Sequence, residues 1–165
     1  MKKIILTIAA VFAFGFANAQ EGGFQVGFNA GIPMGDAKDG YSLAYGFDVA
    51  YLMPFGDKFK AGGTIGYASF MGKEIEILGQ NFDLEDISFV PIAATAQYSF
   101  TDNIFGGLDL GYAVGVAPSG IDGGLLFQPK VGYQTEKIEV YTGYRSISVE
   151  DGSISSFNVG LNYKF

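Results

Sequence analysis

Apolar and polar residues alternate along most of the chain from residue 24 onward. Between residues 24 and 32, phenylalanine, valine, alanine and isoleucine occupy the even positions, whereas glutamine, glycine and asparagine occupy the odd ones. Residues 41–53 repeat the pattern, with tyrosine, leucine, phenylalanine, valine and methionine at every second position. Because successive side chains of a strand point to opposite faces, this period of two predicts strands with one apolar face.

Six further segments continue the alternation, which makes eight predicted strands: 59–72, 88–100, 104–116, 124–134, 138–148 and 156–165. Strands of soluble proteins are usually about 5 to 6 residues long. A tilted strand that crosses a bilayer needs about 9 to 11 residues. The length and the even number of these segments therefore predict an all-β fold, an eight-stranded antiparallel up-and-down transmembrane β-barrel.

The predicted connections alternate between short and long. Short turns are expected at 54–58, 101–103 and 135–137, and longer loops at 33–40, 73–87, 117–123 and 149–155. Outer-membrane barrels have short periplasmic turns and long external loops. The run 73–87 contains too many apolar residues for a free coil, so we expect a hairpin there that extends two strands beyond the membrane. Proteolysis of intact cells is expected to cut it near residues 79–81.

The apolar face is assigned to lipid because an eight-stranded barrel has room inside only for side chains that just fill it. The opposite face, rich in glycine, alanine, serine and asparagine, fits that lumen. The charged strand residues also fall on the inward face, and they form the predicted lumen charge network: Asp48, Lys60, Asp109, Lys130, Glu139, Arg145 and Lys164. An outward Lys or Arg near the bilayer midplane would cost about 2 to 4 kcal/mol.

Buried charges must be paired or hydrated. We therefore expect Asp48, Asp109 and Glu139 to pair with Lys60, Lys130 and Arg145 and to close the lumen. The many inward glycines and alanines leave an alternative, a narrow passive pore for ions or small solutes. A second alternative turns the apolar face inward, as in a soluble secreted ligand-binding barrel.

Aromatic girdles at both water interfaces are expected of a membrane barrel. Those at the short-turn end are Phe59, Phe100, Tyr133, Tyr163 and Phe165. Those at the loop end are Tyr41, Tyr67, Tyr112 and Phe157.

The first residues have the order of a secretory signal peptide: Lys2 and Lys3, an apolar run, then Ala17-Asn18-Ala19. We therefore expect a signal peptide at 1–19 and an outer-membrane barrel at 20–165. The chain carries 10 Lys and Arg against 17 Asp and Glu, which excludes nucleic acid as an expected partner. It contains no Cys and no His, so we expect no disulfide, no thiolate or imidazole metal site and no cofactor.

The final strand alternates apolar and polar residues and ends on phenylalanine, with Leu161, Tyr163 and Phe165 on the apolar face. It resembles the terminal strand of Gram-negative outer-membrane barrels, and the whole mature chain is similar to the small barrels of the OmpA and OmpX kind. The resemblance implies that these three residues contribute to an insertion signal read by the barrel-assembly machinery. It also implies that the chain lies in outer-membrane lipid.

The sequence predicts a non-enzymatic protein with a structural or loop-mediated role. Without His, the usual serine hydrolase arrangement has no base. Acidic residues outnumber basic ones in the predicted external loops, so an extracellular ligand at these acidic loops is an expected partner. The acids match no EF-hand spacing, and no metal site is predicted.

Overall fold

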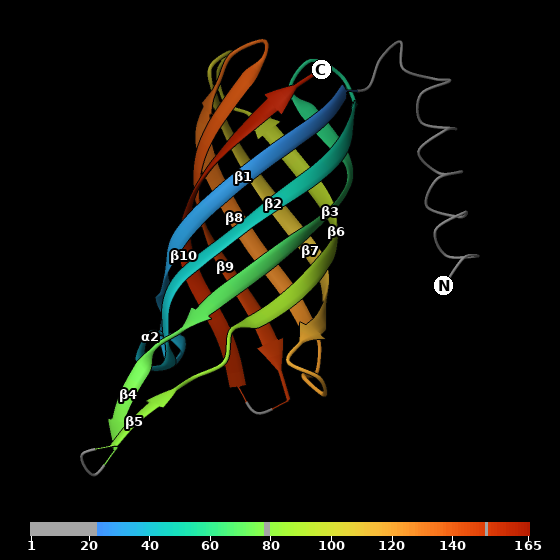
Figure 1. The fold of residues 1–165 in the computed structure, drawn as a ribbon. Coiled ribbons are helices and arrows are strands. Elements are labelled where there is room, and N and C mark those ends of the chain that lie inside the picture. Colours follow the sequence, from blue (N-terminus) through green and yellow to red (C-terminus); the bar gives the residue numbers. More distant parts are fainter. Residues whose placement is uncertain (1–22, 78–79, 151) are drawn as a thin grey trace.

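The computed structural model describes residues 23–77, 80–150 and 152–165. Eight long strands form a closed barrel, and two short strands form a separate hairpin beyond one end of it (Figure 1). The predicted signal peptide lies outside the described residues. Every neighbouring pair of barrel strands is antiparallel, so the predicted fold class is confirmed.

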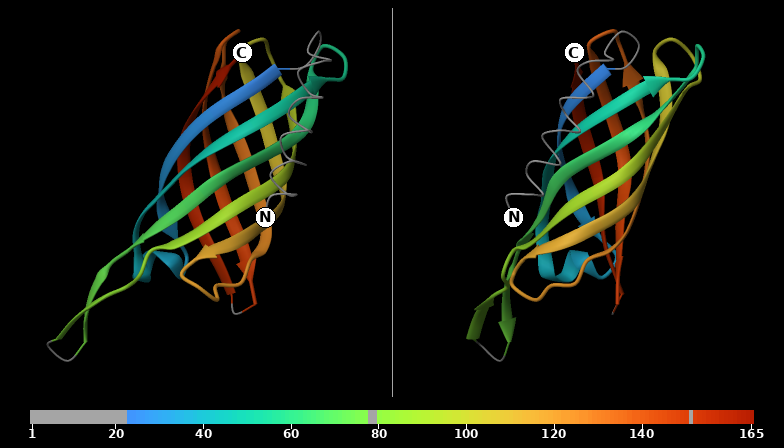
Figure 2. Two further views of the ribbon diagram at one scale, coloured as in Figure 1. Left: turned by 45° about the vertical axis from the view of Figure 1, so that its right-hand side comes forward. Right: turned by 90° about the vertical axis from the view of Figure 1, so that its right-hand side faces the viewer.

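The barrel strands tilt strongly around a common axis, as Figure 2 shows from two sides. The eight barrel strands are β1 (Gly23–Met34), β2 (Tyr41–Pro54), β3 (Phe59–Gly72), β6 (Ile87–Ser99), β7 (Ile104–Ala117), β8 (Gly124–Gln134), β9 (Ile138–Val149) and β10 (Gly152–Lys164). Their order around the wall is β1, β10, β9, β8, β7, β6, β3 and β2. The barrel closes where β1 pairs with β10, with Phe28 opposite Leu161.

The connections at the loop end differ from the expected loops in two places. Residues 33–40 contain the end of β1 and a short helix, α2 (Ala37–Gly40). The prediction of a loop at 149–155 is wrong, because β9 ends at Val149 and β10 already begins at Gly152. The two strands stay paired to their tips, with Ile147 opposite Ile154.

The segment predicted to extend beyond the membrane does form a hairpin. It consists of β4 (Glu74–Ile77) and β5 (Gln80–Asp83), which pair only with each other. The hairpin projects away from the barrel end that is opposite to the C-terminus (Figures 1 and 2). The expected cleavage region, residues 79–81, lies partly outside the described residues.

The outer surface of the barrel is apolar. Phe28, Phe47, Ile92 and Val159 each expose more than half of their surface. In the described barrel strands no charged residue occupies an outward position. A soluble protein rarely exposes such a continuous apolar area, so the lipid-facing assignment stands and the soluble alternative does not. Within the described residues, no helix is long and apolar enough to cross a membrane.

Inward glycines let neighbouring strands approach closely. A Cβ atom added at Gly62 would lie 1.8 Å from the carbonyl oxygen of Tyr51, and one added at Gly111 would lie 2.0 Å from that of Ile92. Both obstacles are backbone atoms of the adjacent strand, so they cannot rotate away. These glycines therefore serve strand packing and curvature, and they do not open a path through the lumen.

Candidate functional site

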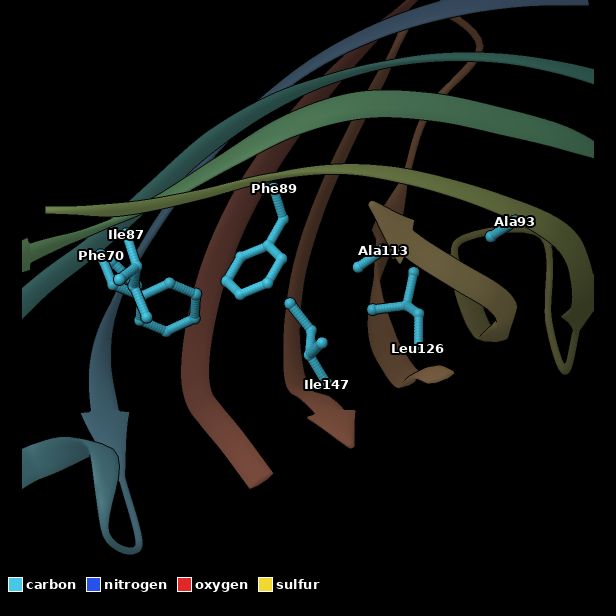
Figure 3. Packing of buried hydrophobic residues seen from close by; sticks show 8 residues of the cluster. Phe70, Ile87, Phe89, Ala93, Ala113, Leu126 and Ile147 are labelled. Carbon is cyan, nitrogen blue, oxygen red and sulfur yellow. The ribbon is translucent and has the colours of Figure 1, made fainter. Parts of the chain in front are cut away.

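The lumen contains an apolar cluster at the loop end, which the sequence analysis does not predict. We call this cluster the apolar cap: Ala44, Phe70, Ile87, Phe89, Ala93, Ala113, Leu126 and Ile147. Phe70, Phe89 and Ile147 are fully buried, and the Phe70 and Phe89 rings meet edge to face with centroids 6.4 Å apart. Figure 3 shows these side chains directed into the barrel from several strands. Large apolar side chains therefore fill part of the lumen, beside the small and charged residues that the sequence predicts there.

Tyr41 belongs to this interior region and not to the outer aromatic girdle. A register irregularity between Tyr41 and Leu43 interrupts the alternation at the start of β2. The Tyr41 ring then packs against the apolar cap, edge-on to Phe70 at 6.2 Å. A bulge of this kind shifts the following residues to the other face, which the alternating sequence does not reveal. Tyr112 and Phe157 remain on the outer surface, as predicted.

Below the apolar cap, the lumen contains two ion pairs, one between the neighbouring strands β7 and β8 and one between β2 and β9, which are not neighbours. The Lys130 ammonium lies 2.8 Å from the Asp109 carboxylate, and the Arg145 guanidinium lies 3.8 Å from the Asp48 carboxylate. Neutral partners complete both pairs, since Asn29 donates to Asp48 at 2.8 Å and Thr95 donates to Asp109 at 2.8 Å. The Arg145 Nε–H group also donates to Gln128.

Glu139 is the centre of a third polar cluster, closer to the short-turn end. Its side chain is almost completely buried and accepts hydrogen bonds from Gln97 at 3.1 Å and from Asn162 at 3.2 Å. Gln25 donates to it at 3.4 Å, and the Lys164 ammonium lies 3.6 Å away. These donors come from β1, β6 and β10. One carboxylate therefore connects β1 and β10, where the barrel closes, to the opposite wall.

The observed bases include Lys164 in place of the expected Lys60. Asp48, Asp109 and Glu139 lie with Arg145, Lys130 and Lys164, respectively. Lys60 is the base without an acid: in the part of the chain that the structure describes, no carboxylate lies within 4.0 Å of its ammonium. The expected partnership of Lys60 with a lumen acid is therefore wrong. The alternation of inward and outward positions along a strand predicts that a side chain points inward. It does not predict which side chain of another strand lies beside it.

Little space remains for water among these polar side chains. The cavity between Asp48, Asp109, Lys130, Glu139 and Tyr141 offers about 20 Å³ to water molecules, room for only a few of them. The apolar cap lies between this cavity and the loop end. The small cavity and the apolar cap favour the closed interior over the narrow pore.

The external end of the described chain is acidic. Glu74, Asp83, Glu85 and Asp86 are all exposed around the base of the hairpin. Among the described residues, no group of three or more His, Cys, Asp or Glu is arranged to hold a metal ion. One of these acids has a local role, because the Gly72 N–H group donates to Asp86 at 2.9 Å.

The three residues of the predicted insertion signal lie on the outer surface of β10 or directly after it. Leu161 and Tyr163 point outward opposite Phe28 and Val26. Phe165 is 78% exposed, its ring meets that of Tyr163 edge to face, and its N–H group donates to the Phe24 carbonyl. Recognition by the assembly machinery stays a prediction.

A closed barrel of eight tilted strands, with an apolar exterior and charges only inside, defines a transmembrane β-barrel. No protein-family model and no curated protein matches the sequence. Solved structures do match: Ail of Yersinia pestis in a phospholipid bilayer nanodisc has a TM-score of 0.59 at 16% identity. That alignment covers 88% of this chain and 100% of Ail.

Two further structures agree with this likeness. The crystal structure of Ail, the attachment invasion locus protein of Y. pestis, with the heparin analogue sucrose octasulfate has a TM-score of 0.55 at 16% identity, covering 88% of this chain and 98% of Ail. A de novo designed transmembrane β-barrel has a TM-score of 0.56 at 9% identity, with the same two coverages. The chain thus has the fold of the small outer-membrane barrels, which confirms the resemblance at the level of fold.

Proposed function

We propose that this protein is a non-enzymatic outer-membrane barrel that binds a cationic partner outside the cell through its projecting hairpin. The observation that carries the proposal is the β4–β5 hairpin itself, which extends past the barrel end and pairs with no barrel strand. A two-stranded hairpin is only marginally stable alone in water. Its outer edges present unpaired backbone groups, and an added strand would use them.

The charge around the hairpin supports a cationic partner. Glu74 lies opposite Asp83 in the hairpin register, and Glu85 and Asp86 follow β5. Lys73 lies beside them, but its ammonium donates to the Lys38 carbonyl at 2.5 Å. Ail was crystallised with a polysulfated heparin analogue, whereas the acids at this hairpin would repel a polyanion. Complementary charge favours encounter with a basic partner.

The closed interior supports a structural role for the barrel. The apolar cap and the ion pairs fill the lumen, so the barrel acts as a support for the external hairpin. In planar bilayers we expect no steady conductance from the folded protein. A stable open level would favour the narrow pore instead.

Enzymatic activity is not proposed because no activating base accompanies a nucleophile. The sequence contains no His and no Cys. Ser119 and Ser153 lie beside glycines at the loop end, where serine commonly forms turns. A serine nucleophile needs an adjacent base to be reactive.

Export and assembly are part of the same proposal. The 1–19 segment directs export, and Leu161, Tyr163 and Phe165 present the outward pattern that the barrel-assembly machinery reads. Their exposed positions on the closing strand support this role.

The binding proposal is tested with a fluorescent peptide of alternating lysine and valine, titrated onto the protein in neutral micelles. We expect saturable binding that weakens with salt, because screening reduces contacts between exposed charges. The double change Glu74→Lys with Asp83→Lys should abolish most of this binding. A peptide of alternating glutamate and valine should not bind.

The matched control is Asp57→Lys with Asp102→Lys, which makes the same charge change in the short turns at the opposite end. We expect this control to bind the lysine peptide nearly as well as the unchanged protein. Equal losses in both double variants would show attraction to net charge alone, and the hairpin proposal would then be wrong.

A further inference from the structure

The short-turn end of the barrel contains a cavity that is separate from the external hairpin. This mouth cavity has a volume of about 200 Å³ and is lined by Gly23, Leu52, Pro54, Lys60, Lys164 and Phe165, with Gln25 and Glu136. It lies at the end of the molecule where the C-terminus is labelled in Figure 1. Its lining combines apolar residues with two lysines, Lys60 and Lys164.

The charges of the lumen leave a positive excess at this mouth. The inward acids Asp48, Asp109 and Glu139 lie with Arg145, Lys130 and Lys164. In the described chain, Lys60 has neither an ion-pair partner nor a side-chain hydrogen bond, although it is only partly exposed. An ammonium without an acid beside it is met by water or by an anion.

Lys164 can contribute to the same site. Its ammonium lies 3.6 Å from Glu139, and that carboxylate already accepts hydrogen bonds from Gln25, Gln97 and Asn162. An ammonium has three donors, so one contact with Glu139 leaves others for the cavity. One acid also lines this space, Glu136. It does not lie within ion-pair distance of Lys60 or Lys164.

We propose that the mouth cavity binds a phosphate group between Lys60 and Lys164. Lysine binds phosphate as a point charge with several donors. The cavity is larger than a phosphate ion, and the apolar side chains of Leu52 and Pro54 in its lining suit an attached organic group. The phosphate is either a free ion in the periplasm or the headgroup of an inner-leaflet phospholipid.

The test uses the isotope-labelled protein folded in maltoside micelles, which contain no phosphate. Inorganic phosphate is titrated at constant ionic strength, and NMR follows the backbone amides of Gly23 and Leu52. Ile147, in the apolar cap, is the remote reference. A parallel titration adds short-chain phosphatidylglycerol without free phosphate. Saturable shifts at Gly23 and Leu52 with inorganic phosphate identify a free phosphate site. Shifts with the lipid alone identify a headgroup site.

Variants separate a built site from general attraction. Lys60→Met should weaken the apparent affinity by about tenfold or more, because it removes a charged hydrogen-bond donor. Lys60→Arg should keep binding. Lys58→Met removes the same charge from the neighbouring exposed turn, outside the cavity lining, and should change the affinity by less than about twofold.

Three results would overturn the proposal. The first is the absence of saturable shifts at Gly23 and Leu52 with both probes. The second is an equal loss of affinity in Lys58→Met and Lys60→Met. The third is an unchanged affinity in Lys60→Met. If Lys60→Met does not fold, Lys60→Gln serves as the second variant with the same expected loss.

Discussion

Near the external loops the barrel interior is filled by Phe70, Phe89 and Ile147, whereas its lower part is filled by acids, bases and amides. The apolar cap excludes water through packing alone, and its stability falls with each contact that is lost. The polar part depends on complete partnerships, because a single missing partner leaves a buried charge uncompensated. The comparison shows how one narrow lumen can be closed by two different kinds of interaction.

The largest expected effect is in the polar part. Glu139→Ala leaves Lys164 without its acid and leaves Gln25, Gln97 and Asn162 without their acceptor. Breaking a buried pair in this way should lower the free energy of unfolding by about 3 to 5 kcal/mol. Urea titration in micelles, followed by circular dichroism because the protein has no Trp, measures the change. Glu136→Ala, in an exposed turn, is the control and should have little effect.

The apolar cap should respond through cavity formation. Ile147→Ala removes a fully buried side chain and should cost about 2 to 5 kcal/mol in the same urea titration. Ile138→Ala changes the same residue type on the outer face of the same strand. It should cost less because detergent tails fill the space. Equal losses at both positions would contradict the assignment of Ile147 to the interior.

Both interior regions depend on a lipid-facing exterior, which a charge can test. Val159 points outward from β10 with 57% of its surface exposed. Val159→Arg should make folding into a bilayer less favourable by about 2 to 4 kcal/mol. Ser153→Arg, near the tip of the same strand, should insert normally. Heat-modified mobility on gels reports the folded fraction, and equal folding of both variants would count against the assignment.

The smallest expected effect concerns Lys60, which has no acid to lose. Lys60→Met should change the free energy of unfolding by less than about 0.5 kcal/mol, the usual range for residues without special contacts. Lys130→Met, which leaves Asp109 unpaired in the lumen, should cost much more. Similar losses at the two lysines would show that Lys60 has a stabilising partner.

Several features follow from local sequence patterns. The two-residue period predicts the eight strands and their outward faces, and the apolar run at 73–87 predicts the projecting hairpin. Two errors have local causes. At 149–155 the apolar residues Val149 and Ile154 continue the strand pattern, and this signal is the correct one, against the predicted loop. At Tyr41 a bulge reverses the face, and no residue type marks it.

The candidate site follows from the sequence only in part. The alternation along each strand correctly predicts these inward charged residues: Asp48, Asp109, Glu139, Lys130, Arg145 and Lys164. The same alternation also places Phe70, Phe89 and Ile147 inside. The sequence does not distinguish them from lipid-facing residues, because the outer face is apolar as well. The mouth cavity has no sequence signal, since Gly23, Lys60 and Lys164 come from three different strands.

By itself, the sequence determined the strands, their length, which suits a tilted strand that crosses a bilayer, and the face that meets lipid. Alternation is a property of neighbouring residues in one segment. Only the tertiary structure decided which acid meets which base and that aromatic side chains close the loop end. The reason is geometric: Asp48 and Arg145 come from strands far apart in the chain, whereas the other two ion pairs depend on the register of neighbouring strands. Their partnerships depend on strand tilt and register around the whole barrel.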